Sequence, residues 1–315
     1  MTPENIKKLY EDGFQGAPVD YAQHESLFED GIVKTGIDID HLVKTNPGKG
    51  KRAFLWRSRE KFDPGAFGME PQTRGSCVSH GSRSARDTTR CVEIHIKGES
   101  EEYYKRGATE PTYMARGHNS EGMVPAKAAR FESEYGFLFR EKYPFADLTN
   151  LNERIANPRY LTDELKVKCK DHNVGEYLTP QKDDQAMALF YNGYSCHSGQ
   201  NIGFKDNPNS KGIHERSGSW NHDMATVGYD DTKEIWDRRV YFVTNSWGRH
   251  NAQWSKWIND ATMQHILGSP ITGMIVVDAS VWEKYFLGGR SIYFYSDIKG
   301  FPTKNLPDYG AEEFL

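Results

Sequence analysis

Three polar side chains, far apart in the chain, have the types needed for acyl transfer through a covalent intermediate. Cys77 follows Gly75-Ser76 and opens a helical pattern, His222 opens an apolar run, and Asn245 closes a second one. A thiol at a helix N-terminus faces the positive end of the macrodipole, which lowers its pKa and favours the attacking thiolate. Each residue alone also has an ordinary structural role, so only their combination indicates chemistry.

The segments around His222 and Asn245 predict a β-hairpin. Apolar strands are predicted for residues 223–229 and 239–244, and the turn-rich segment 230–238 joins them. An antiparallel pair would bring the start of the first strand, His222, next to the end of the second, Asn245. The asparagine oxygen would then accept the ring N–H and fix the tautomer of the histidine.

The rest of the chain divides into a helical half and a strand half. Helices are predicted for residues 77–96, 123–135, 163–170, 179–193 and 278–286, and further strands for 194–199, 273–277 and 291–295. This order predicts an α+β fold with a helical lobe and an antiparallel sheet or barrel lobe, and an active site in the cleft between them. We expect an N-terminal arm (1–51), a main domain (52–300; helical lobe mainly 70–190, sheet lobe mainly 191–300) and a C-terminal tail (301–315).

The motifs resemble those of papain-like cysteine peptidases, the family of papain and the cathepsins, in a divergent and non-secreted form. The histidine lies 145 residues after the cysteine, and the asparagine 23 residues further on, which is the order and approximate spacing of that family. The similar segments are Gln72-Thr-Arg-Gly-Ser-Cys77, the run from His222 to Gly228-Tyr229, Asn245-Ser-Trp-Gly248, and the helix with its following Tyr-Pro segment in 122–145.

The resemblance implies thiol-dependent hydrolysis of peptide bonds through an acyl-enzyme thioester. Cys77 would be the nucleophile, His222 the general base and acid, and Asn245 the residue that orients His222. The backbone N–H of Cys77 and the side-chain amide of Gln72 would form the oxyanion hole. The substrate would be a polypeptide, and neither a cofactor nor a metal ion is expected.

Three further residues take roles only through the resemblance. Trp247 would shield the bond between His222 and Asn245 from water. Asp223 and Gly122 would contact the substrate, and an acid at position 223 would favour a basic substrate side chain or, equally, form a salt bridge or face the solvent.

The sequence also departs from the family pattern. Gln72 lies one residue closer to Cys77 than is usual, and Arg74 stands where many members carry a disulfide-forming cysteine. His80, one turn after Cys77, is expected either to pack in the helix or to lie near the thiol. The arm lacks the helical pattern of an inhibitory pro-segment, which favours an anchor.

Composition limits the partners and the compartment. The net charge of −4 and a pI near 6.3 give no indication of a nucleic-acid partner. No secretory signal or apolar membrane span is apparent, and the four cysteines form no C-x-x-C pair. We therefore expect a cytoplasmic or virion-associated protein with no membrane partner.

Two other functions fit the same residues. The chain could be a structural or assembly component of a virion or other large particle, contacting its partners through the arm and the tail. It could also be a Cys-His-Asn amidase that acts on cell-wall or isopeptide bonds, because those reactions are acyl transfers too.

Overall fold

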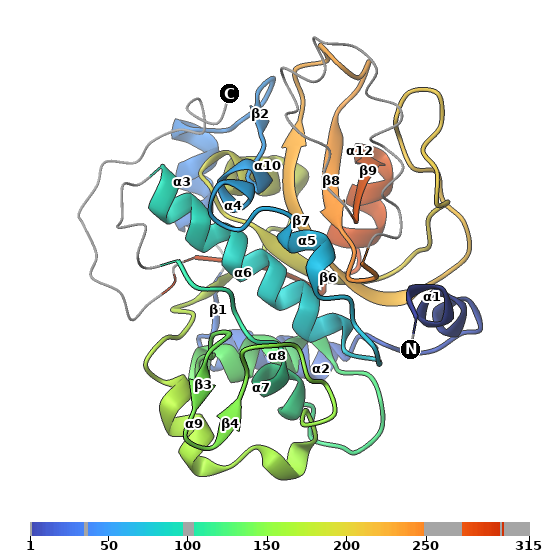
Figure 1. Ribbon diagram of the computed structural model, residues 1–315. Helices are drawn as coiled ribbons and strands as arrows, with labels where there is room; N and C mark the ends of the chain where they lie inside the picture. Colours follow the sequence, from blue (N-terminus) through green and yellow to red (C-terminus); the bar gives the residue numbers. More distant parts are fainter. Residues whose placement is uncertain (1, 35–36, 97–103, 249–272, 297, 299–315) are drawn as a thin grey trace.

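The computed structural model describes residues 2–34, 37–96, 104–248, 273–296 and 298. The arrangement is mixed α+β, as predicted, and Figure 1 shows helix α6 (Cys77–His95) running between a sheet and a group of shorter helices. That group contains α7 (Glu110–Met114), α8 (Pro125–Glu134), α9 (Asp163–Cys169) and the hairpin of β3 (Lys142–Tyr143) and β4 (Ala146–Asp147). A short 3-10 turn, η2 (Pro158–Tyr160), precedes α9.

The main sheet is antiparallel except at one edge. Its strand order is β1-β5-β10-β6-β7-β8-β9, with β2 (Arg52–Ala53) paired to β7, and only β1 and β5 run parallel. The strands are β1 (Val33–Lys34), β5 (Tyr177–Leu178), β6 (Cys196–Asn201), β7 (Asn221–Asp230), β8 (Val240–Thr244), β9 (Met274–Asp278) and β10 (Ile292–Tyr295). The predicted hairpin is confirmed, because β7 and β8 pair antiparallel with a register shift between Thr226 and Tyr229.

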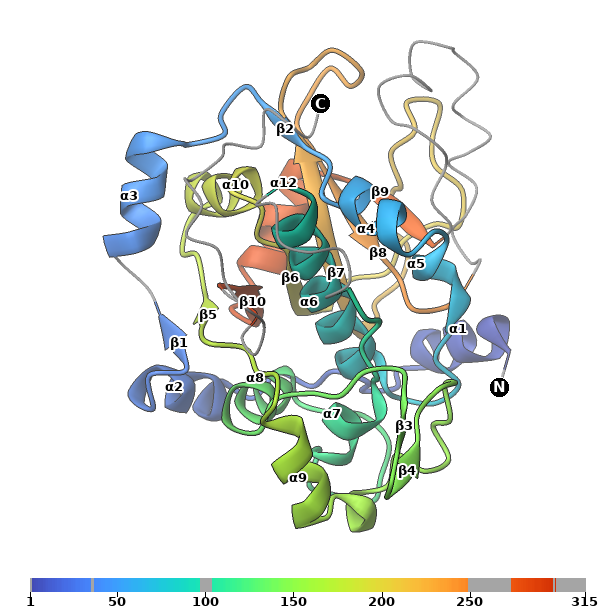
Figure 2. The same cartoon turned by 60° about the vertical axis from the view of Figure 1, so that its left-hand side comes forward.

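Helix α6 packs directly on this sheet, which brings its N-terminus to the strands that carry His222 and Asn245. Every residue from Cys77 to Ile94 is buried. A Cβ atom at Gly81 would lie 2.0 Å from a carboxylate oxygen of Asp223 on β7, so this glycine is what allows the close approach of helix and strand. Helices α4 (Trp56–Phe62) and α5 (Ala66–Met69) lie beside α6 (Figure 2).

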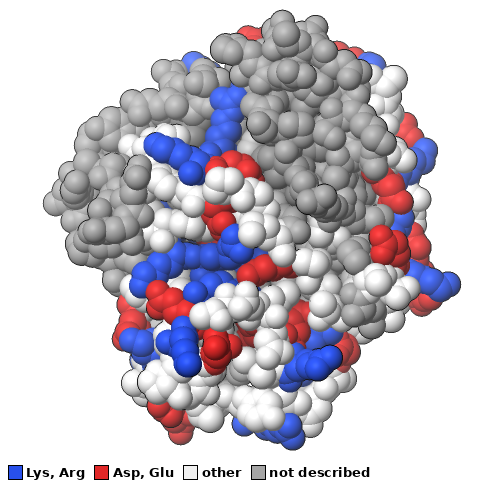
Figure 3. All heavy atoms as spheres, viewed as in Figure 1, with Lys and Arg blue, Asp and Glu red and all other residues white. Residues whose placement is uncertain are grey.

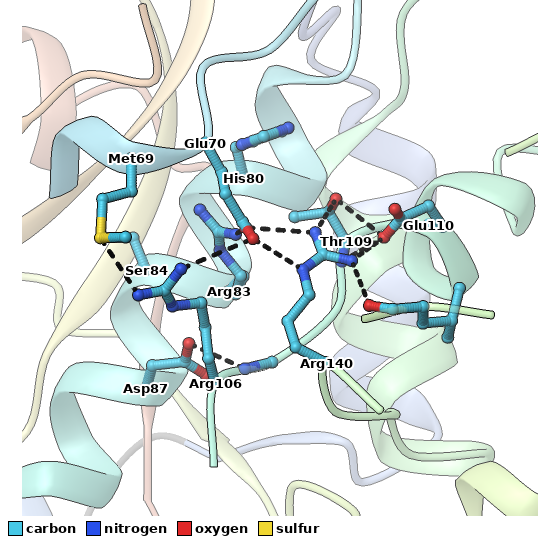
Figure 4. A network of polar contacts seen from close by, with 12 residues as sticks. Met69, Glu70, His80, Arg83, Ser84, Asp87, Arg106, Thr109, Glu110 and Arg140 are labelled. Atoms are coloured by element: carbon cyan, nitrogen blue, oxygen red, sulfur yellow. Dashed lines mark hydrogen bonds and ion pairs between the residues drawn. The ribbon is translucent and has the colours of Figure 1, made fainter. Parts of the chain in front are cut away.

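A network of buried and partly buried ion pairs holds the outer side of α6 (Figure 4). Glu70 pairs with Arg83 of α6, with Arg140 and with Arg106, and Arg140 also reaches Glu110 at 2.6 Å. Burial alone would raise the pKa of Glu70, but Arg83 and Arg140 outweigh it and lower the pKa to about 2. In Figure 3, positive and negative side chains are interleaved over this face of the molecule.

Two predictions about elements need correction. The helix predicted from Thr179 begins only at Asp183 (α10, Asp183–Tyr191), because residues 177–178 form β5 and the Thr179 hydroxyl bonds the carbonyl of Ile292 on β10 at 3.2 Å. The arm, in which the sequence showed no helical pattern of an inhibitory pro-segment, does contain helices, α1 (Pro3–Glu11), α2 (Tyr21–Glu29) and α3 (Ile37–Thr45). It also supplies β1 to the sheet.

The remaining sequence predictions fall close to the observed elements. The predicted cap at Asp278 is present, since its carboxylate accepts from the Ser280 amide ahead of α12 (Ala279–Trp282), which continues as the π-helical turn η4 (Glu283–Leu287). No helix in the described ranges is both long and apolar enough to cross a membrane. The tail 301–315 and the segment that follows Asn245-Ser-Trp-Gly248 lie outside the described residues.

Candidate active site

The histidine and the asparagine lie together at the end of the β7–β8 hairpin. Nε2 of His222 is 2.9 Å from Oδ1 of Asn245, and both side chains are buried. Because an amide oxygen only accepts hydrogen bonds, Nε2 carries the ring proton and Nδ1 is the free acceptor. The Trp247 ring lies 4.8 Å from the His222 ring, centre to centre, and its role as a shield of this pair stays a prediction.

Cys77 is the first residue of α6 and is fully buried. Burial and the carboxylate of Asp223, the neighbour of His222 on β7, raise the pKa of its thiol, and the Tyr10 hydroxyl and the Asp223 backbone N–H act to lower it, so these groups lie near the sulfur. The thiol therefore lies against the strand that carries His222. In the described structure Nδ1 of His222 has no hydrogen-bond partner.

Gln72 also contacts the hydroxyl of Tyr10. Its Nε2 donates to Tyr10 Oη at 3.2 Å and to the carbonyl of Arg74 at 2.8 Å. Its Oε1 accepts from Ser246 Oγ at 2.5 Å, and its backbone N–H donates to the Ser246 carbonyl. The side chain is thus held at both ends, with one N–H directed toward the Tyr10 hydroxyl.

The Tyr10 hydroxyl consequently lies where the predicted oxyanion donors and the thiol converge. Tyr10 belongs to α1, and its ring packs 4.7 Å from the His222 ring and 5.4 Å from the Trp247 ring. Helix α1 is held in turn by Lys7, whose ammonium contacts Asp206 at 2.5 Å. The segment between β6 and β7 thus contacts the arm.

After α1 the arm continues as an extended segment between residue 123 and the start of β7. The Met123 N–H donates to the Gly16 carbonyl at 2.9 Å, and the Ala17 N–H donates to the Asn221 carbonyl at 3.0 Å. A Cβ atom at Gly122, which has φ +88°, would lie 2.5 Å from the Gln15 carbonyl. Gly122, predicted to contact substrate, therefore lies directly under main chain of the arm.

The covered site holds a neutral thiol and a neutral imidazole. Burial, with a further contribution from Asp223, raises the pKa of Cys77 to about 12. Burial lowers the pKa of His222 to about 3, in spite of the bond from Asn245. A thiolate–imidazolium pair is thus disfavoured while the arm excludes water.

Asp223 has a partner inside the protein. Its carboxylate is buried and lies 3.0 Å from Nδ1 of His197 on β6, and burial raises its pKa despite that contact. This is the salt-bridge alternative named for Asp223 from the sequence. Its role in specificity stays a prediction.

His80 packs as a helix residue against a carboxylate. Its Nε2 is 3.2 Å from Oε1 of Glu153, and both side chains are buried. Glu153 also accepts hydrogen bonds from Thr73 and Ser76 in the loop before Cys77. Sequence reasoning missed Glu153 and His197, since neither lies in a recognisable motif.

Tyr10 was missed as well, although the sequence carries a signal for its helix. Thr2 followed by Pro3 is a typical helix start, and the Thr2 hydroxyl does accept from the Asn5 amide. Ile6 and Tyr10 are four residues apart and both buried, so they form the apolar face of α1.

No protein-family model and no curated protein matches the chain. A search of solved structures finds similar chains, and those described below are papain-like cysteine proteases.

Three of these neighbours span most of the chain. Xylellain, a cysteine protease from Xylella fastidiosa, has 15% identity and a TM-score of 0.48, covering 83% of this chain and 89% of its own. Procathepsin B S9 from Trypanosoma congolense has 12% identity and a TM-score of 0.44, and the match covers 77% of this chain and 76% of its own. Procathepsin L 3 from the Tenebrio molitor larval midgut has 13% identity and a TM-score of 0.42, and the match covers 87% of this chain and 86% of its own. At these identities the similarity concerns the fold alone.

Proposed function

We propose that this chain is a thiol peptidase with Cys77 as nucleophile, His222 as general base and acid, and Asn245 as the residue that orients His222. In this proposal the arm occupies the place of the substrate, so the described arrangement is a closed form of the enzyme.

One observation carries the proposal: an extended segment of the arm is hydrogen-bonded between residue 123 and the start of the strand that carries His222. The arm makes backbone hydrogen bonds to both walls, to Met123 on the helical side and to Asn221 on the sheet side. Main-chain bonds of this kind recognise a peptide whatever its side chains are. A cleft that binds one segment in this way is suited to bind another as a substrate.

The chemistry follows from the contacts of the three side chains. Once water and substrate replace the arm, the thiol proton passes to Nδ1 of His222, and the thiolate attacks the substrate carbonyl carbon. His222 gives that proton to the leaving amine as the C–N bond breaks and the thioester forms. His222 then takes a proton from water, which attacks the thioester and releases the acid and the thiol.

The oxyanion of each tetrahedral intermediate would lie where the Tyr10 hydroxyl lies now. The donors are one N–H of the Gln72 amide and the backbone N–H of Cys77 at the start of α6. Loss of one such donor costs roughly 10²–10³-fold in kcat in a comparable hydrolase.

A second candidate, a scaffold that keeps an inert site, is favoured by the same closure. With Tyr10 over the sulfur and both catalytic groups neutral, the described form is not competent for attack. An assembly protein with a permanently inserted arm would show the same contacts.

A full-length variant with Tyr10→Ala and Phe14→Ala tests the proposal. These changes remove the ring over His222 and the ring that lies against Gly75. We expect hydrolysis of a peptide library by the double variant, little by the parent chain, and none after the further change Cys77→Ala. Purified cell-wall fragments and an isopeptide-linked substrate, assayed in parallel, distinguish the amidase alternative.

Thiol labelling separates the peptidase from the scaffold. In the double variant, iodoacetamide followed by mass spectrometry should modify Cys77 before the buried Cys91 and Cys169. Labelling of Cys77 no faster than of those two, together with no hydrolysis, would favour the scaffold. Undiminished hydrolysis after Cys77→Ala would reject the assignment of the nucleophile.

A further inference from the structure

The loop from Thr73 to Ser76, which links Gln72 to Cys77, is built around a buried carboxylate. Oε2 of Glu153 accepts from the Thr73 N–H at 2.5 Å and from the Thr73 hydroxyl at 2.6 Å. Oε1 accepts from the Ser76 hydroxyl and lies 3.2 Å from Nε2 of His80. Glu153 is 5% exposed, so these donors replace water around both oxygens.

A second carboxylate holds the same loop from the solvent side. Glu121 accepts from the Gly75 N–H and from the Arg74 guanidinium at 2.6 and 2.9 Å. The Arg74 guanidinium also donates to the backbone carbonyl of Glu153 at 3.0 Å. The loop is therefore fixed on both sides of Arg74, at the position where many papain-like enzymes carry a disulfide-forming cysteine.

The Arg74 carbonyl transmits this arrangement to the oxyanion site. It lies between the Thr73 and Gly75 amides that the two carboxylates hold, and it accepts one N–H of the Gln72 side chain at 2.8 Å. With Oε1 of Gln72 bonded to Ser246, the amide plane is set, and the other N–H can only point toward the site now filled by the Tyr10 hydroxyl.

We propose that Glu153 is a positioning residue for the oxyanion hole, acting through the Thr73–Ser76 loop and the Arg74 carbonyl to direct the Gln72 amide. The inference rests on the proposed function, because an oxyanion forms only if the site performs acyl transfer. Glu153 itself does not touch the substrate. Glutamine would not replace it, since its NH₂ group would face a donor from the loop or from His80.

Comparison of two reactions of Cys77 tests this role. Peptide hydrolysis needs the oxyanion hole, whereas iodoacetamide alkylation forms a C–S bond with loss of iodide and creates no oxyanion. In the full-length Tyr10→Ala, Phe14→Ala background, Glu153→Gln should lower kcat by about 10–100-fold, because a misdirected donor loses only part of the roughly 10²–10³-fold contribution of a well-placed one. KM should stay within about threefold and the alkylation rate within about twofold.

Matched variants control for a general loss of structure. Glu134→Gln changes an exposed carboxylate that pairs with Arg130 on α8, and should leave both reactions unchanged. Glu121→Gln should have a smaller effect than Glu153→Gln, since water can reach the 39% exposed Glu121 side chain. If Glu153→Gln does not fold, Thr73→Val removes only the hydroxyl bond and should lower kcat a few-fold with alkylation unchanged.

Hydrogen exchange gives a readout that does not depend on hydrolysis. In the otherwise unchanged chain, Glu153→Gln should accelerate exchange of the Thr73 amide and leave the amides in the middle of α6 unaltered. An unchanged kcat, an equal fall in kcat and alkylation, or unchanged Thr73 exchange would each overturn the proposal. If the background variant hydrolyses no peptide while Thr73 exchange does respond, the proposed function fails and the loop contacts stand.

Discussion

Two buried histidine–carboxylate pairs lie beside the candidate nucleophile, one from each lobe. His80 and Glu153 are 3.2 Å apart on the helical side, and His197 and Asp223 are 3.0 Å apart on the sheet side. Their electrostatics are opposite. Burial alone would raise both carboxyl pKa values, yet the pKa of Glu153 is lowered to about 2 and that of Asp223 is raised.

The difference lies in the number of donors. Glu153 receives Thr73 and Ser76 in addition to its histidine, whereas His197 is the only side chain in the described ranges that donates to Asp223. A single histidine does not offset the rise in pKa that desolvation causes in a buried carboxylate. A histidine together with two hydroxyls and a backbone amide does offset it. The first pair therefore shapes a loop, and the second places a poorly compensated charge near the thiol.

Removal of the His197 imidazole should cause the largest loss of stability. His197→Phe leaves the Asp223 carboxylate buried without a donor, and the free energy of unfolding should fall by about 3–5 kcal/mol. Urea denaturation at neutral pH measures it. His24→Phe is the control, because His24 is also buried but shares one neutral bond with Tyr293, worth about 1 kcal/mol. Equal losses in the two variants would contradict the comparison.

The second-largest effect should come from acid, which lowers the free energy of unfolding by protonating Glu153. A carboxyl with a pKa of about 2 when folded and 4.5 as its ordinary value adds stability that is fully present above pH 4.5 and lost as the pH falls toward 2. The loss amounts to about 3 kcal/mol for this group. Unfolding free energies measured between pH 5 and 2 should fall less steeply for Glu153→Gln than for the parent chain. Parallel curves would show that Glu153 is not the titrating group.

Asp223→Asn should have the smallest effect of the three changes. It should make Cys77 more reactive, whereas the other two changes destabilise the protein. Asparagine keeps an acceptor for His197 but removes the charge that raises the pKa of Cys77. In the Tyr10→Ala, Phe14→Ala background, the pH at half-maximal alkylation of Cys77 should move down by up to about one pH unit. An upward shift would mean that the Asp223 carboxylate stabilises the thiolate.

Much of the scaffold could be predicted because its signals are local. The strand predicted at 223–229 is part of β7, and the helix predicted from Cys77 begins at that residue. These elements follow from apolar periodicity, small residues and caps, all of which are read within one segment. The helix predicted from Thr179 was wrong at its start, because pairing with β10 overrides a good local capping signal.

The sequence by itself determined the order of the three candidate catalytic residues and the elements that carry them, since spacing and periodicity belong to the chain alone. Only the tertiary structure decided that Tyr10 covers Cys77 and that Glu153 supports the loop before it. Residue 153 lies 73 positions from His80 and 80 from Thr73, and Tyr10 lies 62 from Gln72. Contacts over such separations come from the packing of whole elements, which a signal within one segment does not predict.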